Sequence, residues 1–218
     1  MNAPSAATPA TPFGRPAATW NERFAAPGYL FGTAPNVWLR ERASAWPAGR
    51  RVLCVADGEG RNSVWLAAQG HQVSAFDIAE VGVAKARTLA AEQGVAVDFS
   101  VSDCDGYAWP VAACDTVVAI FVQFADPAMR SRMFERMVQC LRPGGQLLLL
   151  GYTPQQLVYK TGGPGVLSHL YTAEMLREVF GGNGLRIDEL QEFEDVLAEG
   201  PGHDGRSALV GLVATAPA

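Results

Sequence analysis

The sequence feature that most constrains the fold is a glycine loop that follows a short apolar run. Residues Val52 to Val55 lead into Gly58 and Gly60, after which a helix is expected over 61–69. A run of this length is typical of a buried strand, and the glycines allow a tight turn from strand to helix. Asp77 follows the next apolar run, 17 residues after Gly60, where a carboxylate can reach ribose hydroxyls. The pattern therefore predicts a nucleoside-binding βαβ unit.

The charge of the loop narrows the choice of nucleoside ligand. Asp57 and Glu59 flank Gly58, whereas a loop that binds a dinucleotide must bring backbone N–H groups against a pyrophosphate. At roughly 5 Å and an effective dielectric of about 20, each carboxylate–phosphate pair would cost about 3 kcal/mol. S-adenosylmethionine (SAM) has no phosphate and brings a sulfonium and an ammonium group to the same place. The loop therefore favours SAM as the cofactor.

Several further segments match one known family in their order and spacing. They are Trp20–Phe24, Tyr29–Asn36, Gly58–Asn62, Asp77, Asp103, Leu141–Gly145 and Gly151–Pro154. With these segments the chain resembles, from about residue 20 to 212, the class I SAM-dependent methyltransferases, and especially the small bacterial branch that looks like tellurite and thiopurine methyltransferases. The resemblance implies a methyltransferase with a Rossmann-like fold and SAM as its cofactor.

Two positions depart from the pattern of that family. Cys54 stands where such families usually carry an acidic residue inside the first strand, and Ala56 replaces the first glycine of the loop. If the usual acid helps to hold the methionine ammonium group of SAM, then Asp57 or Glu59 must take its place. The sequence leaves open which of the two does so.

The cofactor site is expected at one edge of the sheet. In an open α/β sheet, ligands bind beyond the carboxyl ends of the strands, where the strand order reverses. The family resemblance places Asp103 beside the adenine amino group, and Ile78 and Phe121 are candidates to sandwich the adenine. The full set of expected cofactor-binding residues is Tyr29, Asp57, Gly58, Glu59, Gly60, Asn62, Asp77, Ile78, Asp103, Cys104 and Phe121.

The substrate side is expected beyond the fourth and fifth strands. Tyr152, Lys160, Thr161 and Gly162 follow the fifth strand, in a segment that suits a mobile cover or a plain connection. His203 lies in the last connection and is a candidate general base, although a single loop histidine can also be exposed and idle. No Ser/His/Asp or two-carboxylate arrangement is visible, and a thiol ionises without such help. A soft nucleophile, such as a thiol, selenium or tellurium compound, is therefore expected.

The composition limits the partners of the protein. The formal net charge is −5 and the chain contains no run of Lys or Arg, which argues against a nucleic-acid surface and favours a small-molecule substrate. No apolar stretch has the length of a membrane span. The four cysteines form no C-x-x-C pair, so we expect buried thiols rather than disulfides. No metal site is expected, and a cytoplasmic monomer or homodimer is predicted.

The alternation of apolar runs and helical segments predicts an α/β fold. With 218 residues, 49% of them apolar, one compact domain is expected over 18–218, with 18–46 covering the cofactor and 1–17 as a disordered tail. The sheet should be Rossmann-like, seven-stranded and mostly parallel, with helices on both faces and a C-terminal antiparallel hairpin. Strands are expected at 51–56, 72–76, 95–101, 114–120, 145–151, 185–193 and 207–214, and helices at 18–25, 35–45, 61–69, 79–92, 127–141 and 172–180.

Two other functions share parts of this pattern. A small NAD(P)-dependent oxidoreductase would also use the turn at Gly58 and Gly60 and the carboxylate of Asp77, but no Tyr-x-x-x-Lys constellation is visible. A SAM-binding module without catalytic activity would have the same fold and cofactor site. Titration with SAM and with NAD distinguishes the first alternative, and acceptor-dependent formation of S-adenosylhomocysteine distinguishes the second.

Overall fold

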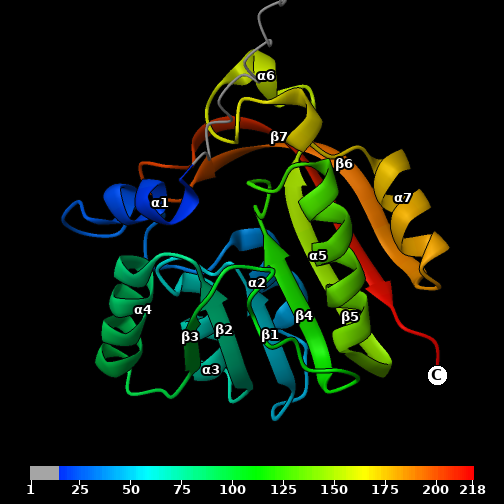
Figure 1. The fold of residues 1–218 in the computed structure, drawn as a ribbon, viewed down its shortest axis with the longest axis horizontal. Helices are drawn as coiled ribbons and strands as arrows, with labels where there is room; N and C mark the ends of the chain where they lie inside the picture. The colour runs from blue at the N-terminus through cyan, green and yellow to red at the C-terminus, as the bar shows by residue number, and fades with distance from the viewer. Residues whose placement is uncertain (1–14) are drawn as a thin grey trace, which may run out of the picture.

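The computed structural model describes residues 15–218, which form one seven-stranded sheet with helices around it (Figure 1). The strand order is β3-β2-β1-β4-β5-β7-β6. The strands are β1 Arg51–Val55, β2 Gln72–Asp77, β3 Asp98–Val101, β4 Cys114–Ile120, β5 Leu141–Tyr152, β6 Arg186–Ala198 and β7 Asp204–Thr215. The helices are α1 Pro16–Phe24, α2 Val37–Ala43, α3 Arg61–Ala68, α4 Glu80–Glu92, α5 Pro127–Cys140, α6 Gln156–Tyr159 and α7 Ala173–Gly182, with a 3-10 turn at Leu167–His169.

The pairing of the strands confirms the predicted topology. β3, β2, β1, β4 and β5 run parallel to one another, while β7 runs antiparallel between β5 and β6. The strand order reverses between β1 and β4, and this is the place where open α/β sheets bind ligands. The expected Rossmann-like sheet with a C-terminal antiparallel hairpin is therefore correct.

Helices cover both faces of the sheet, as expected. α5 and α7 pack on one face through a cluster that includes Phe134, Leu176 and Phe180, and α2, α3 and α4 cover the opposite face. The central strands are apolar on both sides, as in β5, where Leu147 to Leu150 are all buried. The starts of two helices are fixed by capping side chains, since Asp126 accepts from the N–H of Met129 and Thr172 accepts from that of Met175.

The C-terminal hairpin is longer than predicted. β6 and β7 reach Ala198 and Asp204 and are joined by only five residues, because pairing continues to Ala198 opposite Asp204. The strand was expected to end at residue 193, before the exposed side chains of Glu194, Asp195 and Val196, whereas the ladder to β7 extends it and buries Leu197. The short helix α6 was not predicted, and β5 begins directly at the end of α5.

The N-terminal segment lies over the glycine loop. α1 starts at Pro16, inside the range 1–17 predicted as a tail, and the rest of that prediction, up to residue 14, lies outside the described residues. The Phe24 ring lies 3.3 Å from the position that a Cβ on Gly58 would occupy. Figure 1 shows α1 beside the upper end of α4, at the carboxyl ends of the parallel strands. No helix in the described part of the chain is long and apolar enough to cross a membrane.

Candidate active site

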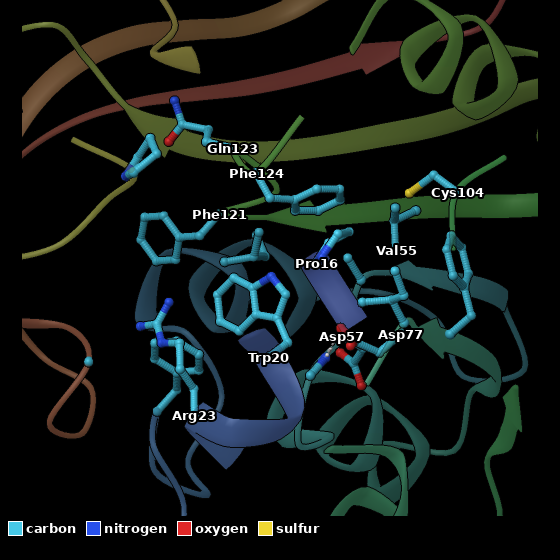
Figure 2. A pocket seen from close by; sticks show the side chains of 18 of the residues that line it. Pro16, Trp20, Arg23, Val55, Asp57, Asp77, Cys104, Phe121, Gln123 and Phe124 are labelled. Atoms are coloured by element: carbon cyan, nitrogen blue, oxygen red, sulfur yellow. Dashed lines mark hydrogen bonds between the residues drawn. The ribbon is translucent and has the colours of Figure 1, made fainter. Parts of the chain in front are cut away.

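A cavity of about 370 Å³ lies at the carboxyl ends of the parallel strands, beneath α1 (Figure 2). Its volume falls within the range of about 300–1,000 Å³ that is typical of small-molecule sites. Its walls come from α1, the β1–α3 loop, the ends of β2 and β4, and the hairpin tip. The predicted site residues that line it are Asp57, Gly58, Asn62, Asp77, Ile78, Asp103, Cys104, Phe121, Tyr152, Gly162 and His203.

The glycine loop is held in left-handed backbone conformations. Ala56, Gly58 and Gly60 all have positive φ angles, of 49°, 62° and 89°. Gly60 was expected to bind the cofactor, but it does not line the cavity. A Cβ at Gly60 would lie 2.6 Å from the Cβ of Ala86, so this glycine allows α3 and α4 to pack closely. Gly58 does line the cavity, as predicted.

Two carboxyl groups meet where the loop faces the cavity. Asp77 accepts hydrogen bonds from the N–H groups of Gly58 at 2.9 Å and Ala79 at 2.8 Å, and Asp57 accepts one from the hydroxyl of Ser63. Burial raises the pKa of Asp77 and, with the nearby Asp77 charge as a smaller cause, raises that of Asp57 to about 7. A cation that enters the cavity would favour the ionised form of Asp57.

Glu59 and Tyr29 do not line the cavity, contrary to prediction. The carboxylate of Glu59 is buried against the Lys85 ammonium at 2.9 Å and accepts a hydrogen bond from the N–H of Leu30 at 2.7 Å. The ring of Tyr29 packs with the apolar residues between α3 and α4, and its hydroxyl donates to the carbonyl of Lys85. Both residues therefore attach the N-terminal segment to the domain. Of the two loop acids, only Asp57 faces the cavity.

One end of the cavity carries the residues expected near the adenine. Ile78, Asp103 and Cys104 line it after β2 and β3. The carboxylate of Asp103 accepts from the N–H of Gly106 at 2.6 Å, which fixes the start of this loop. Burial raises the pKa of the Cys104 thiol to about 12, so this group is not a nucleophile at neutral pH.

Phe121 lies at the other end of the cavity. Its ring stacks on Tyr152 at 4.6 Å between centroids and meets the ring of His203 edge-on at 4.4 Å. Figure 2 shows Phe121 on the opposite side of Trp20 from Asp77 and Cys104. Ile78 and Phe121 both line the cavity, and Phe121 belongs to an aromatic end of it together with Tyr152 and His203.

This aromatic end contains two buried polar atoms without hydrogen-bond partners in the described part of the chain. They are the hydroxyl oxygen of Tyr152, a residue 1% exposed, and Nδ1 of His203, a residue 7% exposed. His203 is thus buried, contrary to the reading of an exposed and idle loop histidine. Burial, followed by the positive charges of Arg61 and Arg23, lowers the pKa of His203 to about 3, so the imidazole is neutral at physiological pH.

Two of the four residues predicted to contact the substrate lie outside the cavity. Lys160 ends α6 in a left-handed conformation, and the hydroxyl of Thr161 donates to the carbonyl of Arg206 at 2.6 Å. Gly162 packs on Tyr152 so closely that a Cβ there would lie 2.6 Å from the Tyr152 hydroxyl oxygen. Of this segment, Gly162, Gly163 and Pro164 form the cavity wall.

The sequence reasoning missed a buried network beneath the hairpin tip. Glu199 pairs with the guanidinium of Arg61 at 2.7 Å and accepts from the side chain of Asn36 at 2.9 Å and the N–H of Val37 at 3.1 Å. Asn62, in turn, accepts from the N–H of Asn36 at 2.9 Å. The network joins three segments that are far apart in the sequence, and it places His203 over the cavity. No local pattern around Glu199 indicates such a partner.

The described residues contain no cluster of three or more His, Cys, Asp or Glu side chains that could hold a metal ion. The cavity instead combines the carboxyl groups of Asp57 and Asp77 with an aromatic end, where the neutral side chains of Tyr152 and His203 lie near the guanidinium groups of Arg61 and Arg23. This arrangement suits a ligand that carries a cation next to a nucleoside.

Comparison with known sequences agrees with this chemistry. Residues 52–145 match a family model described as a methyltransferase domain. The chain is similar to the ubiquinone biosynthesis O-methyltransferases of Pseudomonas aeruginosa, strain LESB58 (34% identical over 51% of this chain and 47% of that one), and of Xanthomonas axonopodis pv. citri (32% identical over 57% and 53%). The chain thus spans about half the length of the curated relatives that it matches.

Solved structures confirm the fold. A structure from work on the conversion of a disulfide bond into a thioacetal group during echinomycin biosynthesis aligns with a TM-score of 0.73, at 18% identity over 92% of this chain and 90% of that one. TehB from Haemophilus influenzae aligns with a TM-score of 0.68, at 18% identity over 84% and 63%. Magnesium protoporphyrin IX methyltransferase from Synechocystis, with S-adenosylhomocysteine bound, aligns at 0.62, with 20% identity over 92% and 82%. Residues 52–145 thus resemble a methyltransferase domain, and the described chain has the fold of these proteins.

Proposed function

We propose that this protein transfers the methyl group of SAM to a small molecule, and that the accepting atom is a soft nucleophile such as a thiol sulfur. One observation carries the proposal. A single cavity has the carboxyl groups of Asp57 and Asp77 at one end. At its other, aromatic end, Tyr152 and His203 are buried and uncharged.

The first half of the cavity fits the cofactor. Asp77 is held by two backbone N–H groups and faces the position of ribose hydroxyls, while Asp57 provides the carboxylate that the first strand lacks at Cys54. SAM, when bound, supplies an electrophilic methyl group on a sulfonium. We assign Asp57 rather than Glu59 to the ammonium group, because the carboxylate of Glu59 already pairs with Lys85.

The second half of the cavity positions the acceptor and excludes water. Phe121, Tyr152 and Phe31 surround His203 with aromatic rings, and an in-line displacement gains most from such alignment and desolvation. His203 is a weak base, since burial and two nearby guanidinium groups hold its pKa near 3. It is therefore poorly suited to take a proton from a phenol, whose pKa is about 10, or from an alcohol, which is a weaker acid still. A thiol ionises by itself near neutral pH, and this difference supports the soft nucleophile.

A hydroxyl acceptor is the second candidate, because the matched relatives are named O-methyltransferases. The two candidates are separated by incubation of the purified protein with methyl-labelled SAM and either thiophenol or phenol. We expect labelled thioether and S-adenosylhomocysteine in equal amounts, with little transfer to phenol. Preferential transfer to phenol would contradict the soft-nucleophile proposal, and SAM binding without transfer to a broad panel of thiols and hydroxyl compounds would favour a non-catalytic SAM-binding module.

The remaining sequence predictions extend this proposal. We expect the enzyme to act in the cytoplasm on a diffusible acceptor, as a monomer or homodimer, and 18–46 to serve as the cover of the cofactor. The contacts of this segment support the last point, because Phe24 packs on Gly58 and the N–H of Leu30 donates to Glu59.

A further inference from the structure

One cationic side chain that lines the cavity has no carboxylate partner among the described residues. Two guanidinium groups line the cavity, those of Arg23 and Arg61. Arg61 is paired with the buried Glu199 at 2.7 Å. Arg23, in α1, stacks on Trp20 at 4.4 Å and lies 6.0 Å from the ring centre of Phe31, but it pairs with no carboxylate among residues 15–218. Arg23 is therefore available to an anion from outside the chain.

Arg23 lies at the aromatic end of the cavity, so an anion that it binds would lie there too. Figure 2 shows Trp20 between Arg23 and the two loop carboxyl groups, with Phe121 on the side of Arg23. The charge of Arg23 also acts on His203, whose pKa it helps to lower. The residue is open to solvent at the cavity mouth, while its guanidinium is partly desolvated by the rings around it. A guanidinium on an aromatic platform is well suited to hold a planar anion.

The inner end of the same region presents two unsatisfied polar atoms to a ligand. The hydroxyl of Tyr152 and Nδ1 of His203 are both buried and without partners in the described part of the chain, and burial of such atoms is costly unless a ligand or water satisfies them. The walls between these atoms and Arg23 are the rings of Trp20, Phe31 and Phe121. The ligand that complements these groups has a polar, nucleophilic end, a flat apolar body and an anionic end.

We propose that the methyl acceptor is an aromatic acid, whose carboxylate is bound by Arg23 and whose nucleophilic atom lies at Tyr152 and His203. This inference rests on the proposed methyltransferase function. In this proposal Arg23 determines the specificity for the acceptor, and Asp57 and Asp77 bind SAM.

The test compares 4-mercaptobenzoate with its uncharged analogue 4-mercaptobenzamide. We expect the wild-type protein to prefer the acid, and Arg23→Gln to raise the KM for the acid about tenfold, the lower end for a charge-assisted contact because Arg23 is open to solvent. The KM for the amide and the affinity for SAM should stay unchanged, and Arg23→Lys should restore part of the preference. Arg40→Gln is the matched control, since Arg40 is exposed on α2 and lies outside the cavity.

Calorimetry with the protein saturated with S-adenosylhomocysteine measures binding of the same two compounds, so Arg23 is tested even if neither thiol is methylated. Weaker binding of the acid alone in Arg23→Gln supports the inference. Equal binding of both compounds to the wild-type protein would overturn it. It would also be overturned if Arg23→Gln weakened the binding of SAM but not of decarboxylated SAM, because the carboxylate would then be that of the cofactor.

Discussion

Replacement of Asp57 by asparagine should change how stability depends on pH. In the folded protein, burial raises the pKa of Asp57 from 3.8 to about 7. An unfolded chain releases this proton near pH 4, whereas the folded chain holds it until about pH 7. The free energy of unfolding of the wild-type protein therefore loses this contribution as pH rises from 4 to 7. Asparagine does not ionise, so the free energy of unfolding of Asp57→Asn should not fall in this way as pH rises.

The size of the effect follows from the pKa values. At about 1.4 kcal/mol per tenfold change in proton affinity, a rise from 3.8 to about 7 corresponds to roughly 4 kcal/mol. Asp57 keeps some contact with water in the cavity, and screening reduces the figure to between about 2 and 4 kcal/mol. The exchange preserves the acceptor for the hydroxyl of Ser63, because an asparagine side chain also presents an oxygen.

Urea unfolding of both proteins between pH 4.5 and 8, without ligand, measures this difference. We expect Asp57→Asn to gain stability relative to the wild type as pH rises, by about 2 to 4 kcal/mol across the range. The pKa of Asp77 is also raised, but Asp77 is present in both proteins, so the difference isolates Asp57. Asp195→Asn, on the exposed side of β6, controls for the substitution itself. A constant difference between Asp57→Asn and wild type at every pH would refute the reasoning.

Four further predictions concern the same cavity. Asp77→Ala should weaken SAM binding at least tenfold in calorimetry, because charge-assisted contacts to ribose are lost. It should also lower thermal stability, because the N–H groups of Gly58 and Ala79 lose their acceptor. An unchanged dissociation constant for SAM would show that Asp77 is not part of the site. Gly58→Val should abolish SAM binding, since φ is +62° and a Cβ would lie 3.3 Å from the Phe24 ring, and normal binding would show that the loop does not face the ligand. His203→Ala should reduce the rate with a thiol acceptor by less than about tenfold, whereas a loss of about 10² to 10⁴ at unchanged SAM affinity would make it a general base. Hydrogen exchange of residues 18–36 should slow when S-adenosylhomocysteine binds, and equal protection in both states would contradict their role as a cover.

Much of the fold could be predicted from the sequence because its signals are local. The apolar runs of β1, β4 and β5 are buried on both sides, so they read directly as central strands. The extended ends of β6 and β7 could not be predicted, because exposed side chains occupy 194–196 and long-range pairing with β7 makes the segment a strand. A mostly parallel seven-stranded sheet with a C-terminal antiparallel hairpin was expected from the alternation of elements and from the family resemblance, and the sheet topology confirms it.

The site was predicted where backbone position decides the outcome and missed where side-chain direction decides it. Asp57 and Glu59 are two residues apart, yet only Asp57 faces the cavity, because Glu59 turns to Lys85 on α4. The partner of Arg61 is Glu199, 138 residues away, and no periodicity connects them. Phe121 follows β4 and lines the cavity as expected, but its ring contacts with Tyr152 and His203 could not be read from its position in the chain.

Calorimetric titration of the purified protein with SAM and, separately, with NAD tests most directly whether this cavity is a cofactor site for methyl transfer. We predict one SAM site per chain, with an affinity that falls below pH 7 in the wild-type protein and much less in Asp57→Asn, and no measurable binding of NAD. Binding of NAD in place of SAM, or SAM binding that is indifferent to both pH and Asp57→Asn, would contradict the account.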